Sequence, residues 1–424
     1  MKVEQALRLL PSLEAMAPLR SLLLSVSRTD EQTRWASAGH YLTVGKRSVE
    51  ADDLRERLDA LLGQITAHLR GLYRTVVEAI EAHGRGDAPA AIAALRAAGG
   101  LEERAGRFRQ AEAWYEVALE LAVELSDRTA ELHLLRVRGA LTRTLGRYSE
   151  AARHCQRSLA LAEAEFNEGA VIDACEELGN ISRAMGEWDG ARAWYERGLS
   201  LNGTLGVRTG WLLLRLGDLA RGRGDVVAAA DLIGRAREHM EAGGDSAGMA
   251  QTLSAMGQVH VAQGHLTAAS AAYREALAWA RHGPEPANLE VDIRIRLADL
   301  ALESGRWMEA ESDLRQAEQS ALAHGLAHRL VEIYTLLGRL SGRGGEETGF
   351  VFFEQALELC RALELDELLM ADVCVAYGQF HGALGNMDSS RAYLERAGET
   401  YQERAQVGGV ERVHAELSRL AVAV

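Results

Sequence analysis

The chain repeats itself about every forty residues over most of its length. Similar segments such as RTLGRYSEAARHCQRSL and RAMGEWDGARAWYERGL can be aligned, and each contains one glycine at the same place. These glycines are Gly106, Gly146, Gly186, Gly224, Gly264, Gly305 and Gly385, with Gly344 in a weaker copy. A period of this length, kept through so many copies, restricts the chain to a repeat architecture in which each unit contacts its neighbours.

Other positions keep the same frame. A small residue stands seven positions before most of these glycines: Gly99, Gly139, Gly179, Gly217, Gly257, Ala298 and Gly378. A large apolar residue stands nine positions after many of them: Tyr115, Tyr195, Ile233, Tyr273, Phe353 and Leu394. Small residues allow two helix backbones to approach closely, and large ones fill the gaps beside them. We therefore expect each unit to be two antiparallel helices joined by a tight turn at the glycine.

The composition agrees with helices. The 424 residues include only five prolines, and Ala, Leu, Arg and Glu are good helix formers. A single hairpin cannot bury its own apolar stripes, so the hairpins must stack. The sequence predicts an all-α fold, a right-handed superhelical solenoid of about eight hairpins with a concave and a convex face and a capping helix at each end.

This pattern of small residue, turn glycine, aromatic residue, alanine and tyrosine resembles the tetratricopeptide repeat. The forty-residue period is similar to the long-helix variety of Pins/LGN adaptors, kinesin light chains and MalT-type regulators. Residues 178–199, LGNISRAMGEWDGARAWYERGL, carry the resemblance most clearly. The resemblance implies that the first helix of each hairpin lines the concave face and that partner segments bind there.

The segments outside the repeats divide the chain further. We expect a helical and irregular segment at 1–49, a long helix at 50–87, the solenoid at 88–406 and a capping helix at 407–424. The apolar seam of the long helix, from Leu54 to Ile80, leaves two uses open. It can pack on the first repeat as a cap, or it can pair two chains in a homodimer. Asp87 and Pro89 predict the start of the next helix.

Motifs for catalysis, cofactors and metals are not found. GHYLTVGKRS lacks the glycine spacing and the Ser or Thr of a phosphate-binding loop, and His324 and His328 have no third ligand. A net charge of −14 argues against nucleic acid as a partner. No apolar run is long enough to span a membrane, and four cysteines without a CxxC pair suggest reduced thiols and a cytoplasmic location.

Helical spacing from the small residues predicts the inward-facing side chains. The predicted peptide-binding set on the concave face is Arg136, Arg143, Asn180, Arg183, Trp211, Asp218 and Arg221. Arg143, Arg183 and Arg221 hold the same place in three successive repeats and could form a ladder for an acidic segment. Alternatively, they pair with neighbouring carboxylates such as Glu176 and Asp218. The resemblance implies that Asn180 matches an asparagine that bonds a partner's backbone in Pins/LGN-type adaptors.

We therefore predict a non-enzymatic scaffold or adaptor that holds a peptide or helical segment of another protein on its concave face. The alternative is a regulatory sensor, in which the solenoid binds a small signal or peptide and changes its conformation or oligomeric state.

Overall fold

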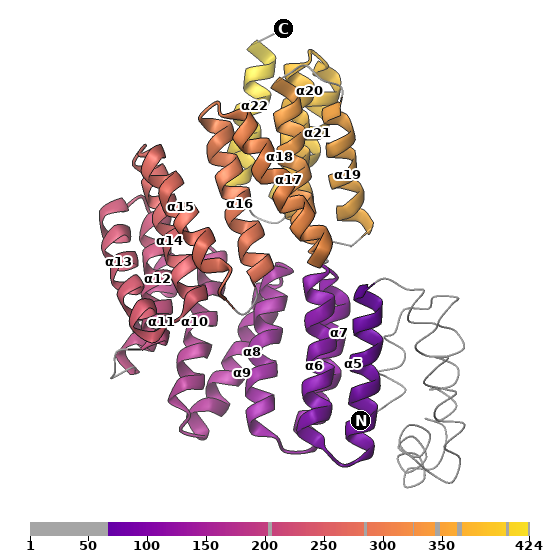
Figure 1. Ribbon diagram of the computed structural model, residues 1–424, viewed down its shortest axis with the longest axis vertical. Coiled ribbons are helices and arrows are strands. Elements are labelled where there is room, and N and C mark those ends of the chain that lie inside the picture. The colour runs from indigo at the N-terminus through magenta and orange to yellow at the C-terminus, as the bar shows by residue number, and fades with distance from the viewer. Residues whose placement is uncertain are drawn as a thin grey trace, which may run out of the picture. The chain divides into compact units, whose positions relative to one another are not determined.

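The structure is a computed structural model that describes residues 67–201, 206–283, 286–324, 326–343, 348–362, 367–403 and 407–422. The chain divides into two compact units, with the boundary between Glu177 and Leu178 inside α10. The helices that begin in the first unit are α5 (Ala67–Gly84), α6 (Ala88–Arg104), α7 (Phe108–Glu124), α8 (Arg128–Thr144), α9 (Tyr148–Ala164) and α10 (Glu168–Ala184) (Figure 1). Asp87 caps α6 as expected, because its carboxylate accepts from the Ala90 amide at 3.2 Å.

The second unit continues the series with helices of similar length. They are α11 (Trp188–Leu201), α12 (Val207–Gly222), α13 (Val226–Gly243), α14 (Ser246–Ala262), α15 (Leu266–Ala280), α16 (Pro286–Glu303), α17 (Trp307–His324), α18 (Ala327–Arg343), α19 (Thr348–Ala362), α20 (Glu367–Ala383), α21 (Met387–Glu403) and α22 (Val407–Val422). The described residues contain helices and turns but no strand. The pairs from α6–α7 to α20–α21 are eight hairpins, as the repeat count predicts.

In seven of the eight hairpins the structure describes a turn glycine that ends the first helix. All seven have a positive φ, between 72° and 82°: Gly106, Gly146, Gly186, Gly224, Gly264, Gly305 and Gly385. At Gly186 the amide donates to Arg183 O, and the following amide of Glu187 donates to Ser182 O. This pair of bonds satisfies the last carbonyls of the helix and needs a left-handed residue, which glycine adopts without steric cost.

The small residues mark the contact between the two helices of a hairpin. A β-carbon built on Gly179 would lie 2.3 Å from Cε1 of Tyr195, and one built on Gly257 would lie 2.5 Å from Cε1 of Tyr273. Cys155, which replaces the aromatic residue in its copy, is fully buried, and its sulfur would lie 2.2 Å from a β-carbon on Gly139. These predicted close approaches are confirmed.

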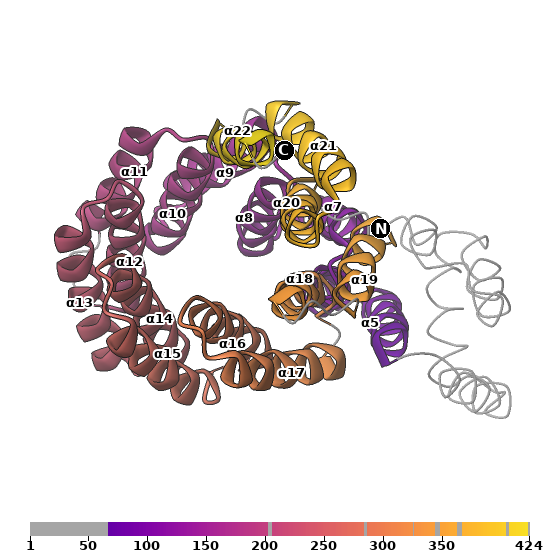
Figure 2. The ribbon, with the colours of Figure 1, turned by 90° about the horizontal axis from the view of Figure 1, so that it is seen from above.

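The first helices of successive hairpins pack on one another within each unit: α6 contacts α8 in the first unit, and α12, α14, α16, α18 and α20 form a continuous row in the second. In the second unit α12, α14 and α16 lie on the inner side of the curve, and α13, α15 and α17 lie outside them (Figure 2). We call the side formed by the first helices the inner face of each unit. The final helix α22 packs on α20 and α21 and buries Val413.

Several predictions concern residues outside the described ranges. These are the segment at 1–49, the first part of the long helix at 50–87, and the glycine-rich turn at Gly344. The use of the long helix as a cap or a dimer contact stays a prediction; its described part, α5, packs on α6. None of the described helices is long and apolar enough to cross a membrane.

The contact between Gly257 and the Tyr273 ring predicts a stability difference. Gly257→Ala should lower the free energy of unfolding by about 1–3 kcal/mol, because a methyl group cannot enter the space that the ring fills. Gly234→Ala in α13 is the control, since a β-carbon there meets no atom within 4 Å. It should raise stability by about 0.5–1 kcal/mol through helix propensity. Urea denaturation followed by circular dichroism measures both, and equal effects would contradict the packing argument.

Candidate functional site

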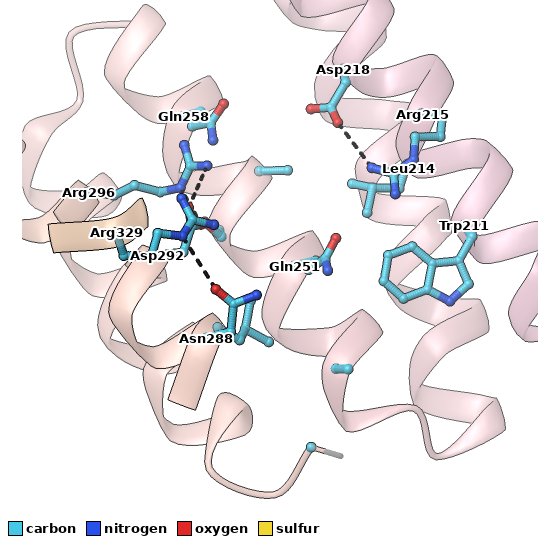
Figure 3. Close-up of a pocket in the computed structure, with 15 residues that line it drawn as sticks. Trp211, Leu214, Arg215, Asp218, Gln251, Gln258, Asn288, Asp292, Arg296 and Arg329 are labelled. Carbon is cyan, nitrogen blue, oxygen red and sulfur yellow. Dashed lines mark hydrogen bonds and ion pairs between the residues drawn. The ribbon is translucent and has the colours of Figure 1, made fainter. Parts of the chain in front are cut away.

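The inner face of the second unit contains an open cavity of about 530 Å³ (Figure 3). Its walls come from three successive first helices, α12, α14 and α16, with Arg329 added from α18 and Gly283 from the turn before α16. The polar and aromatic side chains that line it are Trp211, Arg215, Asp218, Gln251, Ser254, Gln258, Asn288, Asp292, Arg296 and Arg329. The site therefore depends on the stacking of three hairpins, because no single hairpin contributes more than one wall.

The wall formed by α12 is held in place by its own contacts. Trp211 Nε1 donates a hydrogen bond to Asp245 Oδ2 at 3.1 Å, and Asp245 Oδ1 accepts from the Gly248 amide as the cap of α14. The Arg215 guanidinium lies 5.6 Å from the Trp211 ring centroid and 4.0 Å from Asp218. Trp211 is thus fixed to the neighbouring helix while one side of it remains part of the cavity wall.

The wall formed by α14 carries neutral polar groups. Gln251, Ser254 and Gln258 are spaced three and four residues apart, so they share one face of the helix. The side chains of Gln251 and Gln258 have no hydrogen-bond partner among the described residues. Ser254 is 5% exposed, and its buried Oγ has no partner there either. Buried polar groups are normally satisfied, so this row is suited to a ligand that supplies donors and acceptors.

The wall formed by α16 and α18 is charged but balanced. Arg296 donates two hydrogen bonds to Asp292, at 2.9 and 3.5 Å. Arg329 Nη1 lies 3.4 Å from the other side of the same carboxylate, at Oδ1, and its Nε donates to Asn288 Oδ1 at 3.4 Å. With Arg215 and Asp218 on the opposite wall, the lining holds three arginines and two aspartates. Arg329 Nη1 also pairs at 3.0 Å with Glu332, which is not in the lining, so the charges around the cavity are balanced.

The structure places the predicted residues of the second unit in different environments. Trp211 and Asp218 line the cavity. Arg221 lies 3.8 Å from Asp218, whereas Arg183 is exposed and has no partner among the described residues. Asn180 is 5% exposed, and its Oδ1 accepts a hydrogen bond from Tyr195 Oη at 2.9 Å. The side chain of Asn180 is thus engaged inside its own hairpin.

In the first unit, Arg143 lies 3.6 Å from Glu177. For Arg143 and Arg221 the structure therefore favours pairing with carboxylates over an open ladder. Arg136 has no carboxylate partner among the described residues; it lies one helical turn from His133. Arg96 Nη1 lies 2.9 Å from His133 Nε2. Burial, together with the nearby charges of Arg136 and Arg96, lowers the pKa of His133 to about 4.

Three family models of the tetratricopeptide repeat match the sequence, at residues 174–208, 208–281 and 371–399. The chain therefore contains tetratricopeptide repeats at these positions. The matches fall on hairpins α10–α11, α12–α13, α14–α15 and α20–α21. No curated protein matches the sequence.

The chain is similar to several solved structures at low sequence identity. The Rap conjugation gene regulator of plasmid pLS20, in complex with the Phr* peptide, is 14% identical, with 89% of this chain and 95% of that chain covered and a TM-score of 0.51. The apo quorum sensor NprR from B. thuringiensis is 13% identical, with 87% and 97% covered and a TM-score of 0.51. BtubC from P. vanneervenii is 23% identical, with 51% and 91% covered and a TM-score of 0.43.

Several cavity residues were missed by the sequence analysis, although a signal for them exists. Trp211 stands six residues before the small residue of its repeat. The same offset in the next two repeats gives Gln251 and Asp292, both in the cavity lining. Arg215 stands two residues before Gly217, and Arg296 stands two residues before Ala298. Both lie next to the predicted inward-facing positions of their helices. Extending both offsets to every copy would have added Arg215, Gln251, Asp292 and Arg296 to the predicted set.

The contact between Asn180 and Tyr195 predicts a structural role for Asn180. Asn180→Ala should lower the free energy of unfolding by about 1–2 kcal/mol, since it removes the acceptor of a buried hydrogen bond. The double variant with Tyr195→Phe should cost less than the sum of the two single changes, which a double-mutant cycle measures by urea denaturation. Arg183→Ala, an exposed neighbour, is the control and should change stability by less than about 0.5 kcal/mol. Additive effects would contradict the coupling.

Proposed function

We propose that this protein is a non-enzymatic scaffold that holds an extended peptide segment of another protein in the cavity formed by α12, α14 and α16. The observation that supports this is the row of Gln251, Ser254 and Gln258 along α14. An extended peptide presents amide and carbonyl groups at regular intervals, and side-chain amides can both donate to and accept from them. Trp211 would contact an apolar side chain of the peptide, and the paired charges of the other walls would contact its polar groups.

The cavity size sets the length of the segment. A volume of about 530 Å³ is within the range of small-ligand pockets and would hold only a few residues of a peptide at a time. The remaining predicted residues on the inner face would serve a longer partner. All four cysteines are buried, which agrees with the cytoplasmic location that we propose.

A regulatory sensor is the second candidate. The same cavity would bind a short free peptide as well as a segment of a protein, and one structure of this fold was solved with a peptide while another is described as a quorum sensor. In that case binding would change the packing between successive hairpins, because the ligand contacts three of them. A ligand-dependent change in the radius of gyration, measured by X-ray scattering, would favour the sensor over the scaffold.

Selection from a random peptide library tests the binding function. We expect selected peptides to bind the wild-type protein in the micromolar range. The double variant Gln251→Leu, Gln258→Leu should bind them at least about tenfold more weakly, because each lost hydrogen bond contributes about 1 kcal/mol. Isothermal titration calorimetry measures the affinities.

The control for this test is Gln316→Leu on α17. Gln316 is an exposed glutamine on the second helix of a hairpin, away from the cavity lining. It should bind like the wild type. Failure to select any peptide, or equal binding by the double variant, would contradict the proposed function.

A further inference from the structure

A second group of basic side chains lies on the inner face of the first unit. Arg96 on α6 and Arg136 on α8 each stand three residues before the small residue of their hairpin, Gly99 and Gly139. His133 lies one turn before Arg136 and contacts Arg96, with 2.9 Å between Nη1 and Nε2. A guanidinium has only donors, so Nε2 of His133 accepts and the proton of the neutral ring is on Nδ1.

This group differs from Arg143, Arg221 and Arg339 of the inner face in having no carboxylate partner. Arg143 pairs with Glu177, Arg221 with Asp218, and Arg339 with Asp299. Among the described residues, neither Arg96 nor Arg136 has such a pair. The charges of these three arginines are thus neutralised locally, and the charges of Arg96 and Arg136 are not. Arg183, in the second unit, likewise has no side-chain partner among the described residues.

The ionised groups that act on His133 come from three helices. They are Arg96 on α6, Arg136 on α8 and Asp173 on α10. The lowered pKa of His133 is caused first by burial and then by Arg136 and Arg96; Asp173 acts in the opposite direction with a smaller effect. With His133 neutral at pH 7, two positive charges and one negative charge leave a local charge of +1, which suits a single carboxylate.

We propose that Arg96, His133 and Arg136 form an anion site that binds a carboxylate of an acidic partner segment. Each guanidinium can donate charge-assisted hydrogen bonds to the carboxylate oxygens. The contact with His133 holds the Arg96 guanidinium next to α8. This inference deepens the proposed function by naming the partner as acidic, but the site belongs to the first unit and contains none of the cavity residues.

The probe for the test is a blocked tetraglutamate peptide, titrated into the full-length protein at pH 7 and low ionic strength. We expect saturable binding by calorimetry. Arg136→Ala should weaken it by about tenfold or more, because a charged hydrogen-bond donor is lost. Arg339→Ala is the matched control, since Arg339 is an inner-face arginine that pairs with Asp299 at 2.9 Å, and it should leave binding unchanged. No binding, or equal loss in both variants, would overturn the proposal.

The pH dependence of binding tests the role of His133. A bound carboxylate favours the charged imidazole, so the pKa of His133 rises on binding and protons are taken up. Affinity of the wild type should therefore increase as the pH is lowered from 7 towards the pKa of His133. His133→Gln keeps an acceptor for Arg96 but cannot titrate, and its affinity should not increase. An equal pH effect in both proteins would overturn the role of His133.

Two further arms separate the alternatives. Inorganic phosphate should compete only weakly with the peptide, and strong phosphate binding without tetraglutamate binding would overturn the assignment to carboxylate. The cavity variant Gln251→Leu, Gln258→Leu should retain tetraglutamate binding, because its substitutions lie in the second unit. If the wild type binds tetraglutamate but no library peptide, the proposed cavity function fails and this site stands. If the wild type binds library peptides but not tetraglutamate, this site alone fails.

Discussion

The close approach of two helices at a small residue is the contact on which the rest of the structure depends. The Tyr195 and Tyr273 rings lie directly over Gly179 and Gly257, where a β-carbon would be only 2.3 and 2.5 Å from a ring carbon. This contact fixes how far apart the helices of a hairpin lie. Because the contact recurs in each copy, the first helices of successive hairpins come to lie side by side. The inner face is a consequence of that regular stacking.

Because the hairpins stack regularly, residues at the same offset from the small residue of each repeat lie next to one another on the inner face. In the second unit, residues six before the small residue, Trp211, Gln251 and Asp292, lie on three adjacent helices and face one cavity. Each helix adds a different chemistry, which is aromatic and charged on α12, neutral on α14 and charged on α16. The repeat frame thus keeps the fold while leaving a few positions free to vary, and the differences between copies create the site.

The fold could be predicted from the sequence because its determinants are local and repeated. The turn glycines, the small residues and the large residues opposite them occur at fixed offsets, and a mistake in one copy would be corrected by the others. The site was predicted only in part. Trp211 and Asp218 follow from helical spacing, but the pairing of Arg143 with Glu177 depends on distances between helices that spacing alone does not provide.

Asn180 is a second residue whose hydrogen-bond partner helical spacing could not predict. Its position in the stripe indicated a binding residue, yet the Tyr195 hydroxyl reaches it from the second helix of the hairpin and uses its oxygen. That contact depends on how deeply the ring of Tyr195 enters the gap beside Gly179. A sequence shows which residues belong to one face, but the choice of partner within that face is made by distances of a few ångströms.

The ion pairs of the cavity also affect which chemical roles its carboxylates can have. Asp218 and Asp292, the carboxylates in its lining, each lie within 4.0 Å of arginines. A general base needs a carboxylate oxygen that can reach a proton of the substrate, and here arginine side chains lie against both carboxylates. The neutral row on α14 has no such restriction. Its groups can exchange hydrogen bonds with a bound chain, and this arrangement is suited to the recognition of a peptide backbone.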